Sequence, residues 1–487
     1  MSNTTRIASI LASALFASLA AAQITPGNLI VSRTGDGALG LTSAAQARFL
    51  DEYTPAGVFV QTIALPTAPS GTNRMVTDSG TATSNGFITQ SVDGRYLIAV
   101  GYDAAPGTAG VTGTAAATTA RVICRVGLDG SVDSSTALGD AYTTNNFRCA
   151  ASLDGNQFWT AGTGTAPTNG ARYVANLGDT TSTQLSTTVT NLRCINIQNG
   201  QLYCSSQSGA FLGVSAVGTG LPTTGGETIT AVESTTSSSA YDFWFADANT
   251  LYVADDRTNG SGGIMKFTYD AGTMTWPLAY TLTVGASTGC RGLSGYVDNG
   301  VVTLFATANT SSTTSGSIVT GVDNGAGSTF TTIATSPTNT VFRDVQFVRT
   351  PANVTHSGTG CATSFGTPAI GTSGGVPVTG NLNFAITTSN NAPFSFALFM
   401  LAGGPALPVG VNIPGSPACA LIYVIPTVLP GGLTDGLGEL SSPMPIPANA
   451  SLGGADLSAQ IVVFDLSLVG FGLPIGTSDA LTFVVGN

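Results

Sequence analysis

The chain has 487 residues, of which 43% are hydrophobic and only 8% are charged. Ordinary globular chains carry about 25% charged residues, but this hydrophobic share is ample for packed cores and argues against disorder. The formal net charge is −11, with 15 Lys and Arg residues in total, which argues against nucleic acid and anionic membrane surfaces as partners because both attract basic proteins.

The first 22 residues are typical of an export signal. Arg6 supplies a positive start, Ile7 to Leu19 form a short apolar run, and Ala20 to Ala22 offer a small-residue cleavage site. The apolar run is too short to span a bilayer core of about 30 Å. We therefore predict a signal peptide at 1–22, no transmembrane segment, and a mature protein that is secreted or associated with the cell surface or envelope.

Five stretches repeat one pattern: a hydrophobic strand, a hairpin turn and a second hydrophobic strand. The turn is Asx-Gly in four of the five, and Asx-Gly between hydrophobic runs is a strong hairpin signal. Equivalent first-strand positions recur every 45 to 61 residues, mostly close to the length of a propeller blade. The stretches are Phe87–Tyr96, Phe147–Trp159, Leu192–Tyr203, Phe243–Tyr252 and Cys290–Phe305.

The two ends of this region complement each other. Asn28–Ser32, Ala47–Tyr53 and Val58–Ala64 are three strands without a first strand, whereas Val341–Phe347 resembles a first strand with nothing after it. Joined, they complete one blade and leave no exposed edge. The sequence thus predicts an all-β fold with a six-bladed β-propeller over 23–350, or a seven-bladed one if the loop-like stretch Pro66–Ser84 hides a blade.

The pattern changes beyond the repeats. A linker is predicted at 351–360, containing the single histidine, His356. Residues 361–487 are rich in Pro, Gly, Leu and Val and hold at least five short strand-like segments, which predicts a small C-terminal β-sandwich. These segments are Asn381–Thr387, Phe394–Leu401, Ala420–Ile425, Gln460–Leu466 and Ala480–Val485.

Seven cysteines in an exported chain favour disulfides and leave at least one thiol over. Cys361 and Cys419 are the two cysteines beyond residue 300 and are predicted to be bonded. Cys194 and Cys204 flank a hairpin turn and form a second candidate pair. The other three lie on or beside hydrophobic strands, where buried thiols are at least as good an interpretation: they are Cys124, Cys149 and Cys290.

The whole chain resembles a group of exported proteins of environmental bacteria that pair a β-propeller with a small C-terminal β module. The segments that carry this resemblance are Leu29–Gly37, the arginine-bearing first strands, and Pro445–Pro447 with Asp479–Leu481. The resemblance implies a sorting, anchoring or assembly role for the C-terminal module. The activity of the group is uncharacterised, so no catalytic residue is transferred from it.

Arginines recur at the same phase of successive first strands, with aspartates beside them. If these strands line a central channel, the guanidinium groups crowd one part of it and could receive a carboxylate, sulfate or phosphate. The other interpretation is that Arg and Asp pair structurally and tie neighbouring blades together. The candidate ligand-binding residues are Arg148, Arg193, Arg291, Arg343, Asp242 and Asp344. The aromatic residues Trp159, Trp244 and Tyr252 are either blade core or sugar platforms.

Catalytic and metal-binding motifs are scarce. A catalytic triad would need His356, there is no phosphate-binding glycine loop, and no C-x-x-C or Cys/His cluster suggests zinc. We therefore predict no catalytic residue, no metal and no cofactor.

The predicted function is a non-enzymatic binding, adhesion or envelope scaffold protein that binds a glycan, an anionic ligand or a surface protein. The alternative is a metal-assisted propeller hydrolase or lactonase, which needs three carboxylates at one channel mouth.

Overall fold

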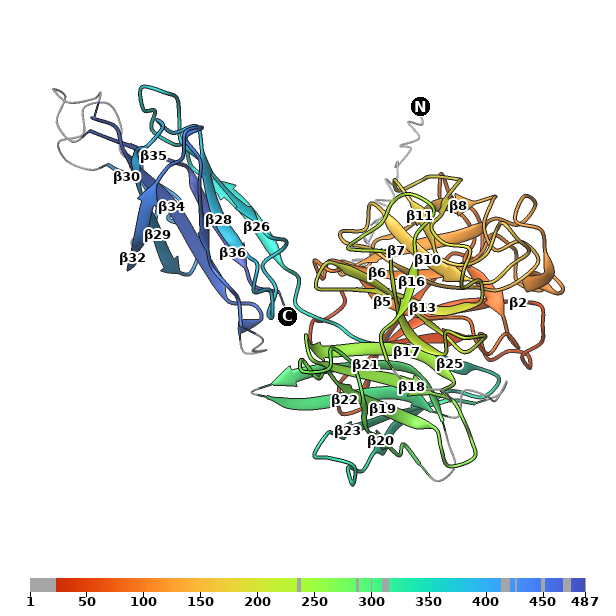
Figure 1. Ribbon diagram of the computed structural model, residues 1–487. Helices are drawn as coiled ribbons and strands as arrows, with labels where there is room; N and C mark the ends of the chain where they lie inside the picture. The colour runs from red at the N-terminus through yellow and green to blue at the C-terminus, as the bar shows by residue number, and fades with distance from the viewer. Residues whose placement is uncertain are drawn as a thin grey trace, which may run out of the picture.

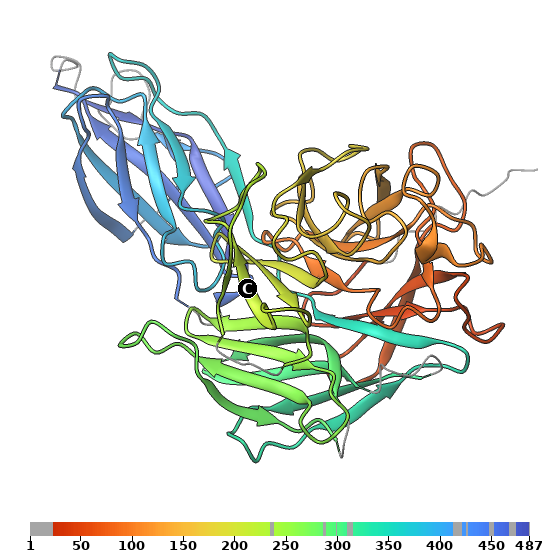
Figure 2. The same cartoon turned by 45° about the vertical axis from the view of Figure 1, so that its right-hand side comes forward.

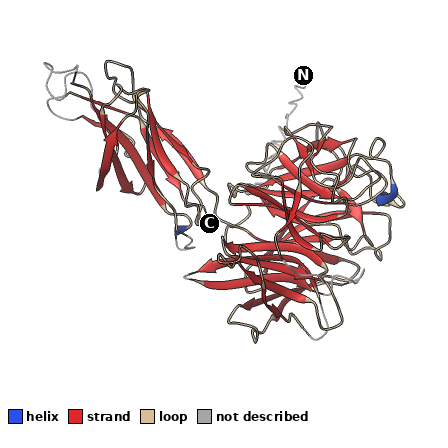
Figure 3. Cartoon of the chain, viewed as in Figure 1, coloured by secondary structure: helices blue, strands red, loops and turns tan. Residues whose placement is uncertain are grey.

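The computed structural model describes residues 23–233, 238–285, 289–298, 300–308, 315–412, 421–424, 427–447, 452–466 and 474–486. These residues form antiparallel sheets joined by turns and loops (Figure 3). The described residues contain no α-helix. A turn of 3-10 helix spans Val111–Gly113. None of the described helical segments is long and apolar enough to cross a membrane. The all-β prediction is confirmed.

Four separate four-stranded sheets follow one another along the chain, each with its strands paired in sequence order. The first holds β9 (Phe147–Ala151), β10 (Phe158–Gly162), β11 (Arg172–Val174) and β12 (Thr183–Gln184). The second holds β13 (Leu192–Gln198), β14 (Gln201–Ser206), β15 (Gly213–Val217) and β16 (Ile229–Ala231). The third holds β17 (Ala240–Asp247), β18 (Thr250–Asp255), β19 (Gly263–Thr268) and β20 (Leu278–Leu282). The fourth holds β21 (Cys290–Asp298), β22 (Val301–Ala308), β23 (Ser317–Val322) and β24 (Thr331–Thr335).

A nine-stranded sheet contains two further groups of four strands. One is β25 (Val341–Phe347), β1 (Leu29–Thr34), β2 (Ala45–Tyr53) and β3 (Phe59–Ala64), and the other is β5 (Ile88–Gln90), β6 (Tyr96–Tyr102), β7 (Arg121–Gly127) and β8 (Val132–Leu138). The short strand β4 (Thr77–Ser79) pairs with both β2 and β6 and so joins the groups. As the sequence predicts, β25 pairs with β1, with Leu29 opposite Phe347.

The first strand of each group touches the first strand of the next. Contacts run from β5 to β9, β13, β17, β21 and β25, and β25 contacts β5 again. We call these six the inner strands. Figure 1 places the labels of β5, β13, β17, β21 and β25 between the labels of β6–β11 and those of β18–β23, and Figure 2 gives a second view of the same arrangement. Buried hydrophobic side chains from successive sheets pack together, as Trp159, Leu202 and Phe243 do.

The remaining strands form a separate body (Figure 1). A six-stranded sheet has the order β26 (Asn353–Ser357), β36 (Ala480–Val484), β34 (Asp456–Phe464), β29 (Phe396–Gly403) and β32 (Thr427–Leu433), with β35 (Ile475–Thr477) on β34. A three-stranded sheet contains β27 (Ala369–Ser373), β28 (Ala385–Ser389) and β33 (Leu440–Pro443), and β30 (Val411–Asn412) pairs with β31 (Leu421–Ile422). One buried cluster joins Ile370 and Ile386 of the smaller sheet with Phe399, Ile461 and Phe483 of the larger one.

Half of the predicted linker is strand. β26 occupies five of the ten residues 351–360 and pairs with β36, with His356 opposite Leu481. The Nδ1 atom of His356 lies 2.8 Å from Asp479. The sequence concealed this strand because its partner lies more than 100 residues further along the chain.

The hairpin pairing of Cys194 with Cys204 was wrong. The structure joins neither of them in a disulfide, and the same holds for Cys124, Cys149 and Cys290. A bulge between Leu192 and Ile195 shifts the register, so that Ile195 rather than Cys194 faces Cys204. Cys361 is disulfide-bonded, but Cys419 lies outside the described residues, so that pairing stays a prediction.

Candidate functional site

The four predicted arginines gather near the starts of the inner strands, around one tyrosine. Tyr241 holds on β17 the position that arginine holds on its neighbours. The guanidinium carbons of Arg193 and Arg291 lie 5.1 and 4.6 Å from the centre of its ring. Arg148 and Arg343 also lie close enough to interact with Tyr241 electrostatically. The shared phase of these residues therefore brings them together in space.

Most of these guanidinium groups hold the segment that precedes β5. Arg343 donates a hydrogen bond of 2.8 Å to the carbonyl of Gly80, Arg291 donates to the carbonyl of Thr83, and Arg148 donates to Ser84 Oγ at 3.1 Å. Arg291 also forms an ion pair of 2.7 Å with Asp256. These contacts favour the structural interpretation of the arginines. They show why arginine suits these positions, since one planar fork binds several carbonyls at once.

Two of the arginine nitrogens nevertheless lack a partner. Arg193 Nε and Arg343 NH1 are buried and make no hydrogen bond with any described residue. Burial lowers the pKa of Arg343 to about 10, because the charged form loses its water. The structure does not test whether an anion binds here, and that interpretation stays a prediction.

The next residue along each of five inner strands forms a second layer. These residues are Cys149, Cys194, Asp242, Gly292 and Asp344. Asp344 accepts a hydrogen bond of 2.8 Å from the backbone N–H of Ile88 on β5, and Asp242 accepts one of 3.1 Å from Leu293 on β21. Each carboxyl group thus ties its own strand to the following inner strand. A Cβ atom on Gly292 would lie 2.2 Å from Asp344 Oδ1, so this position admits only glycine.

Asp242 and Asp344 also interact with each other. Burial raises the pKa of both carboxyl groups, and the charge of Asp242 raises that of Asp344 further. Two neighbouring buried carboxyls cannot both ionise easily, so the pair is expected to hold a proton at neutral pH. A carboxyl group that holds a proton there can act as a hydrogen-bond donor as well as an acceptor.

A cavity of about 540 Å³ opens at the other end of the inner strands. Its walls come from the strand ends, and Thr379, Gly380, Leu382 and Pro447 of the C-terminal body complete the lining. Asp242 is part of the lining, so the second layer reaches the cavity. The volume lies within the range of roughly 300–1,000 Å³ that is usual for small-molecule sites.

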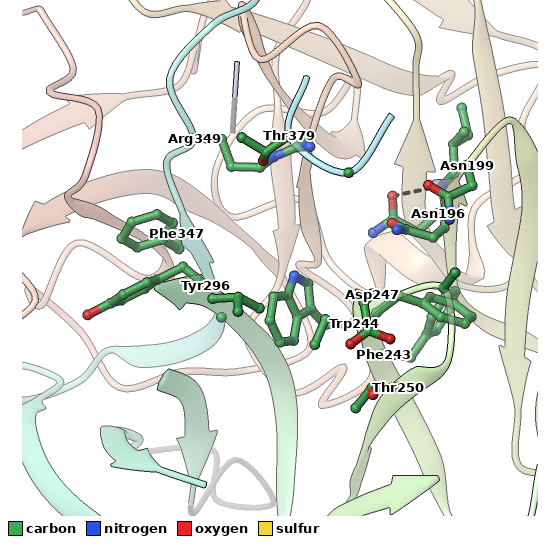
Figure 4. A pocket seen from close by; sticks show the side chains of 18 of the residues that line it. Asn196, Asn199, Phe243, Trp244, Asp247, Thr250, Tyr296, Phe347, Arg349 and Thr379 are labelled. Atoms are coloured by element: carbon green, nitrogen blue, oxygen red, sulfur yellow. Dashed lines mark hydrogen bonds between the residues drawn. The ribbon is translucent and has the colours of Figure 1, made fainter. Parts of the chain in front are cut away.

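Aromatic rings form part of the cavity wall. Trp244, Tyr296 and Phe347 lie on neighbouring inner strands and line the same cavity (Figure 4). The rings of Tyr296 and Phe347 stack with their centres 4.7 Å apart, and Trp244 stacks on Tyr252 at 6.0 Å. These contacts hold the rings in place before any ligand arrives.

Polar groups line the rest of the cavity. They are mainly amides and a carboxylate, namely Gln90, Asn196, Gln198, Asn199, Gln346 and Asp247. Arg349 also lines the cavity, and its NH2 group donates a hydrogen bond of 3.0 Å to the carbonyl of Ser91. Gln90 is held by Gly94 and Arg349, to whose carbonyls its Nε2 donates at 2.7 and 3.0 Å. The cavity therefore combines apolar ring faces with fixed hydrogen-bonding groups.

The predicted arginines lie near the starts of the inner strands, whereas the cavity opens at the other ends of these strands. Of the predicted residues, Asp242 and Trp244 line the cavity, whereas Trp159 and Tyr252 are fully buried in the sheets. The missed residues follow a signal that was available. The positions three residues beyond Arg193 and Arg343 are Asn196 and Gln346, which were missed and line the cavity together with Trp244. Described His, Cys, Asp and Glu residues form no group of three or more that could hold a metal ion.

Comparisons with known proteins give little. No protein-family model matches the chain, and no curated protein matches it in sequence. A "putative 6-phosphogluconolactonase" from Bacteroides uniformis is similar in structure with 13% identity and a TM-score of 0.37, over 74% of this chain and 92% of that one. A polysaccharide lyase gives 10% identity and a TM-score of 0.19, over 92% and 99%. These scores are too low for either likeness to carry an argument.

Proposed function

We propose that the chain is a six-bladed β-propeller followed by a β-sandwich, and that its cavity binds a neutral carbohydrate. The six groups of four strands and the closed circuit of inner-strand contacts support the propeller. The buried cluster shared by two sheets supports the sandwich. With the export-like sequence at 1–22, which lies outside the described residues, we place the protein outside the cytoplasm as a secreted or envelope-associated binding protein.

The cavity chemistry carries the choice of ligand. A sugar ring has an apolar face that packs on aromatic rings and a rim of hydroxyl groups that both donate and accept hydrogen bonds. Trp244, Tyr296 and Phe347 offer the ring faces, and the amides offer donors and acceptors together. The carboxylate of Asp247 disfavours an anionic ligand in the same space.

Replacing Trp244 with Ala is expected to weaken glycan binding at least 10-fold, because the variant loses one of the three aromatic rings of the wall. The measurement is a glycan array with the purified mature chain, followed by calorimetric titration of the best neutral oligosaccharide. Phe394→Ala is the matched control, since Phe394 is 71% exposed and lies outside the cavity. Silence of the wild-type chain across a broad array, or equal affinity of Trp244→Ala, would contradict the proposal.

The alternative function is hydrolysis, by a hydrolase or lactonase. One observation favours it: Asp242 lies in the cavity lining with a raised pKa, as a general acid requires. The metal-assisted form needs three carboxylates, and the described lining holds Asp242 and Asp247. Incubating oligosaccharides and lactones with the wild-type chain, with and without divalent ions, tests this alternative. Product formation that Asp242→Asn abolishes would support it, whereas binding without product would exclude it for those substrates.

A further inference from the structure

Two cysteines from neighbouring sheets meet at the centre of the molecule. Cys149 lies on β9 and Cys194 on β13, each directly after one of the predicted arginines. Their Sγ atoms are 2.8 Å apart, and both residues are fully buried. The two strands themselves are in contact as members of the inner circuit.

This spacing is too short for two separate thiols. Non-bonded carbon atoms settle at about 3.5–4.0 Å, and sulfur is larger than carbon. Two unbonded sulfur atoms at this separation repel each other, whereas a covalent bond at about 2.05 Å removes the repulsion. Cys149 Sγ also lies 3.4 Å from the carbonyl oxygen of Ile195, so neighbouring backbone limits the room for the two atoms to move apart.

We propose that Cys149 and Cys194 form a disulfide that links two neighbouring sheets through their inner strands. The proposal depends on export to an oxidising compartment, where such bonds persist, and not on the glycan proposal. Two S–H bonds break and one S–S bond forms. The two protons and two electrons pass to a disulfide of a thiol–disulfide oxidoreductase or of a low-mass compound, which becomes two thiols.

The buried position sets when the bond forms. Thiol–disulfide exchange needs a thiolate that the partner can reach. In the folded chain, burial raises the pKa of the Cys194 thiol, and both sulfur atoms are closed to solvent. The exchange therefore takes place while β9 and β13 are still approaching, and the finished bond resists reductants until the chain unfolds.

Peptide mapping of the exported wild-type protein tests the bond directly. The unreduced protein is unfolded, alkylated and cut with trypsin, which cleaves after Arg148 and after Arg193 and so frees each cysteine at the start of a peptide. Chymotrypsin then cleaves after Tyr203 and separates Cys194 from Cys204. We expect one linked species containing Cys149 and Cys194, lighter by two hydrogen atoms than the separate thiol peptides, with Cys204 alkylated. Alkylation of both Cys149 and Cys194 would overturn the proposal.

Two serine variants separate this pair from other pairings. Cys204→Ser is expected to keep the linked species, because Cys204 is also buried and free but makes no sulfur contact with the pair. Cys194→Ser is expected to leave Cys149 open to alkylation. A link from Cys149 to any cysteine other than Cys194 in the wild-type peptide map would also overturn the proposal. This result does not depend on whether either variant folds.

Discussion

Replacing Arg48 with Met is expected to lower the free energy of unfolding by about 3–5 kcal/mol, because the change removes a buried cation and its hydrogen bonds from beside buried acidic groups. Arg48 on β2 is fully buried. It donates a hydrogen bond of 2.6 Å to Ser32 Oγ on β1 and one of 3.1 Å to the carbonyl of Gly86. It also donates a hydrogen bond to the carbonyl of Val100 on β6. One side chain thus joins the group that contains both ends of the repeat region to the group that follows it.

The charges around Arg48 explain the size of the effect. Burial lowers its pKa, while the charges of Asp78 and Asp344 act in the opposite direction. Asp78 is buried as well, and it accepts hydrogen bonds of 2.9 Å from Asn85 and 2.7 Å from the N–H of Ser79. The charges of Arg48 and Arg343 both favour its ionised form. Methionine would fill much of the volume but would remove one of these two charges and the hydrogen bonds to three oxygen acceptors.

Urea unfolding followed by tryptophan fluorescence measures this change, and a second arginine provides the control. The side chain of Arg74 is 51% exposed, and its ion pair with Asp103 spans 3.7 Å. Arg74→Met is therefore expected to lose less than about 1 kcal/mol. Equal small losses in the two variants would show that Arg48 does not stabilise the junction between the two groups of strands.

The repeats could be predicted because their signals are local. Asx-Gly turns demand backbone angles that other residues avoid, and Asn199 and Gly200 adopt positive φ angles of 48° and 72° in the structure. The pairing of β1 with β25 could be inferred because an incomplete set at one end matched a spare strand at the other. β26 was missed because its partner β36 lies at the far end of the chain.

The site was only partly predictable for a related reason. The phase of Arg148 and its counterparts identified the inner strands, but phase alone does not say which end of a strand leaves a cavity. That depends on how neighbouring sheets pack and on what covers them, as the lining residues Thr379 and Pro447 show. The contact between Cys149 and Cys194 is equally invisible in the sequence, since it arises between sheets rather than within a hairpin.

A second large effect is expected from Glu233, whose carboxyl group is buried beside β15. Its Oε1 accepts a hydrogen bond of 2.8 Å from the N–H of Val214, whereas its Oε2 is buried and has no partner among the described residues. Gly213 makes room for it, because a Cβ atom there would lie 1.6 Å from Oε1. Burial raises the pKa of Glu233 to about 8, and the charge of Asp255 adds to the shift.

This shift makes the protein less stable as the pH rises. Between the unfolded pKa near 4.5 and the folded value near 8, the folded chain keeps a proton that the unfolded chain has released. The unfolded state is therefore favoured progressively across this window, and the loss reaches about 3 kcal/mol at pH 7. The contribution of Glu233 to stability is fully present below pH 4.5 and disappears as the pH approaches 8.

Replacing Glu233 with Gln removes the titrating group and should raise the free energy of unfolding at pH 7 by up to about 3 kcal/mol. Below pH 4.5 both chains are neutral at this position, so the two should be nearly equal. Urea unfolding at several pH values between 4 and 8 measures the difference, with Glu439→Gln as the control because Glu439 lies exposed immediately before β33 of the C-terminal body. A Glu233→Gln curve that falls with pH as steeply as the wild-type curve would mean that Glu233 ionises in the folded chain without penalty, because water or a rearranged partner reaches Oε2.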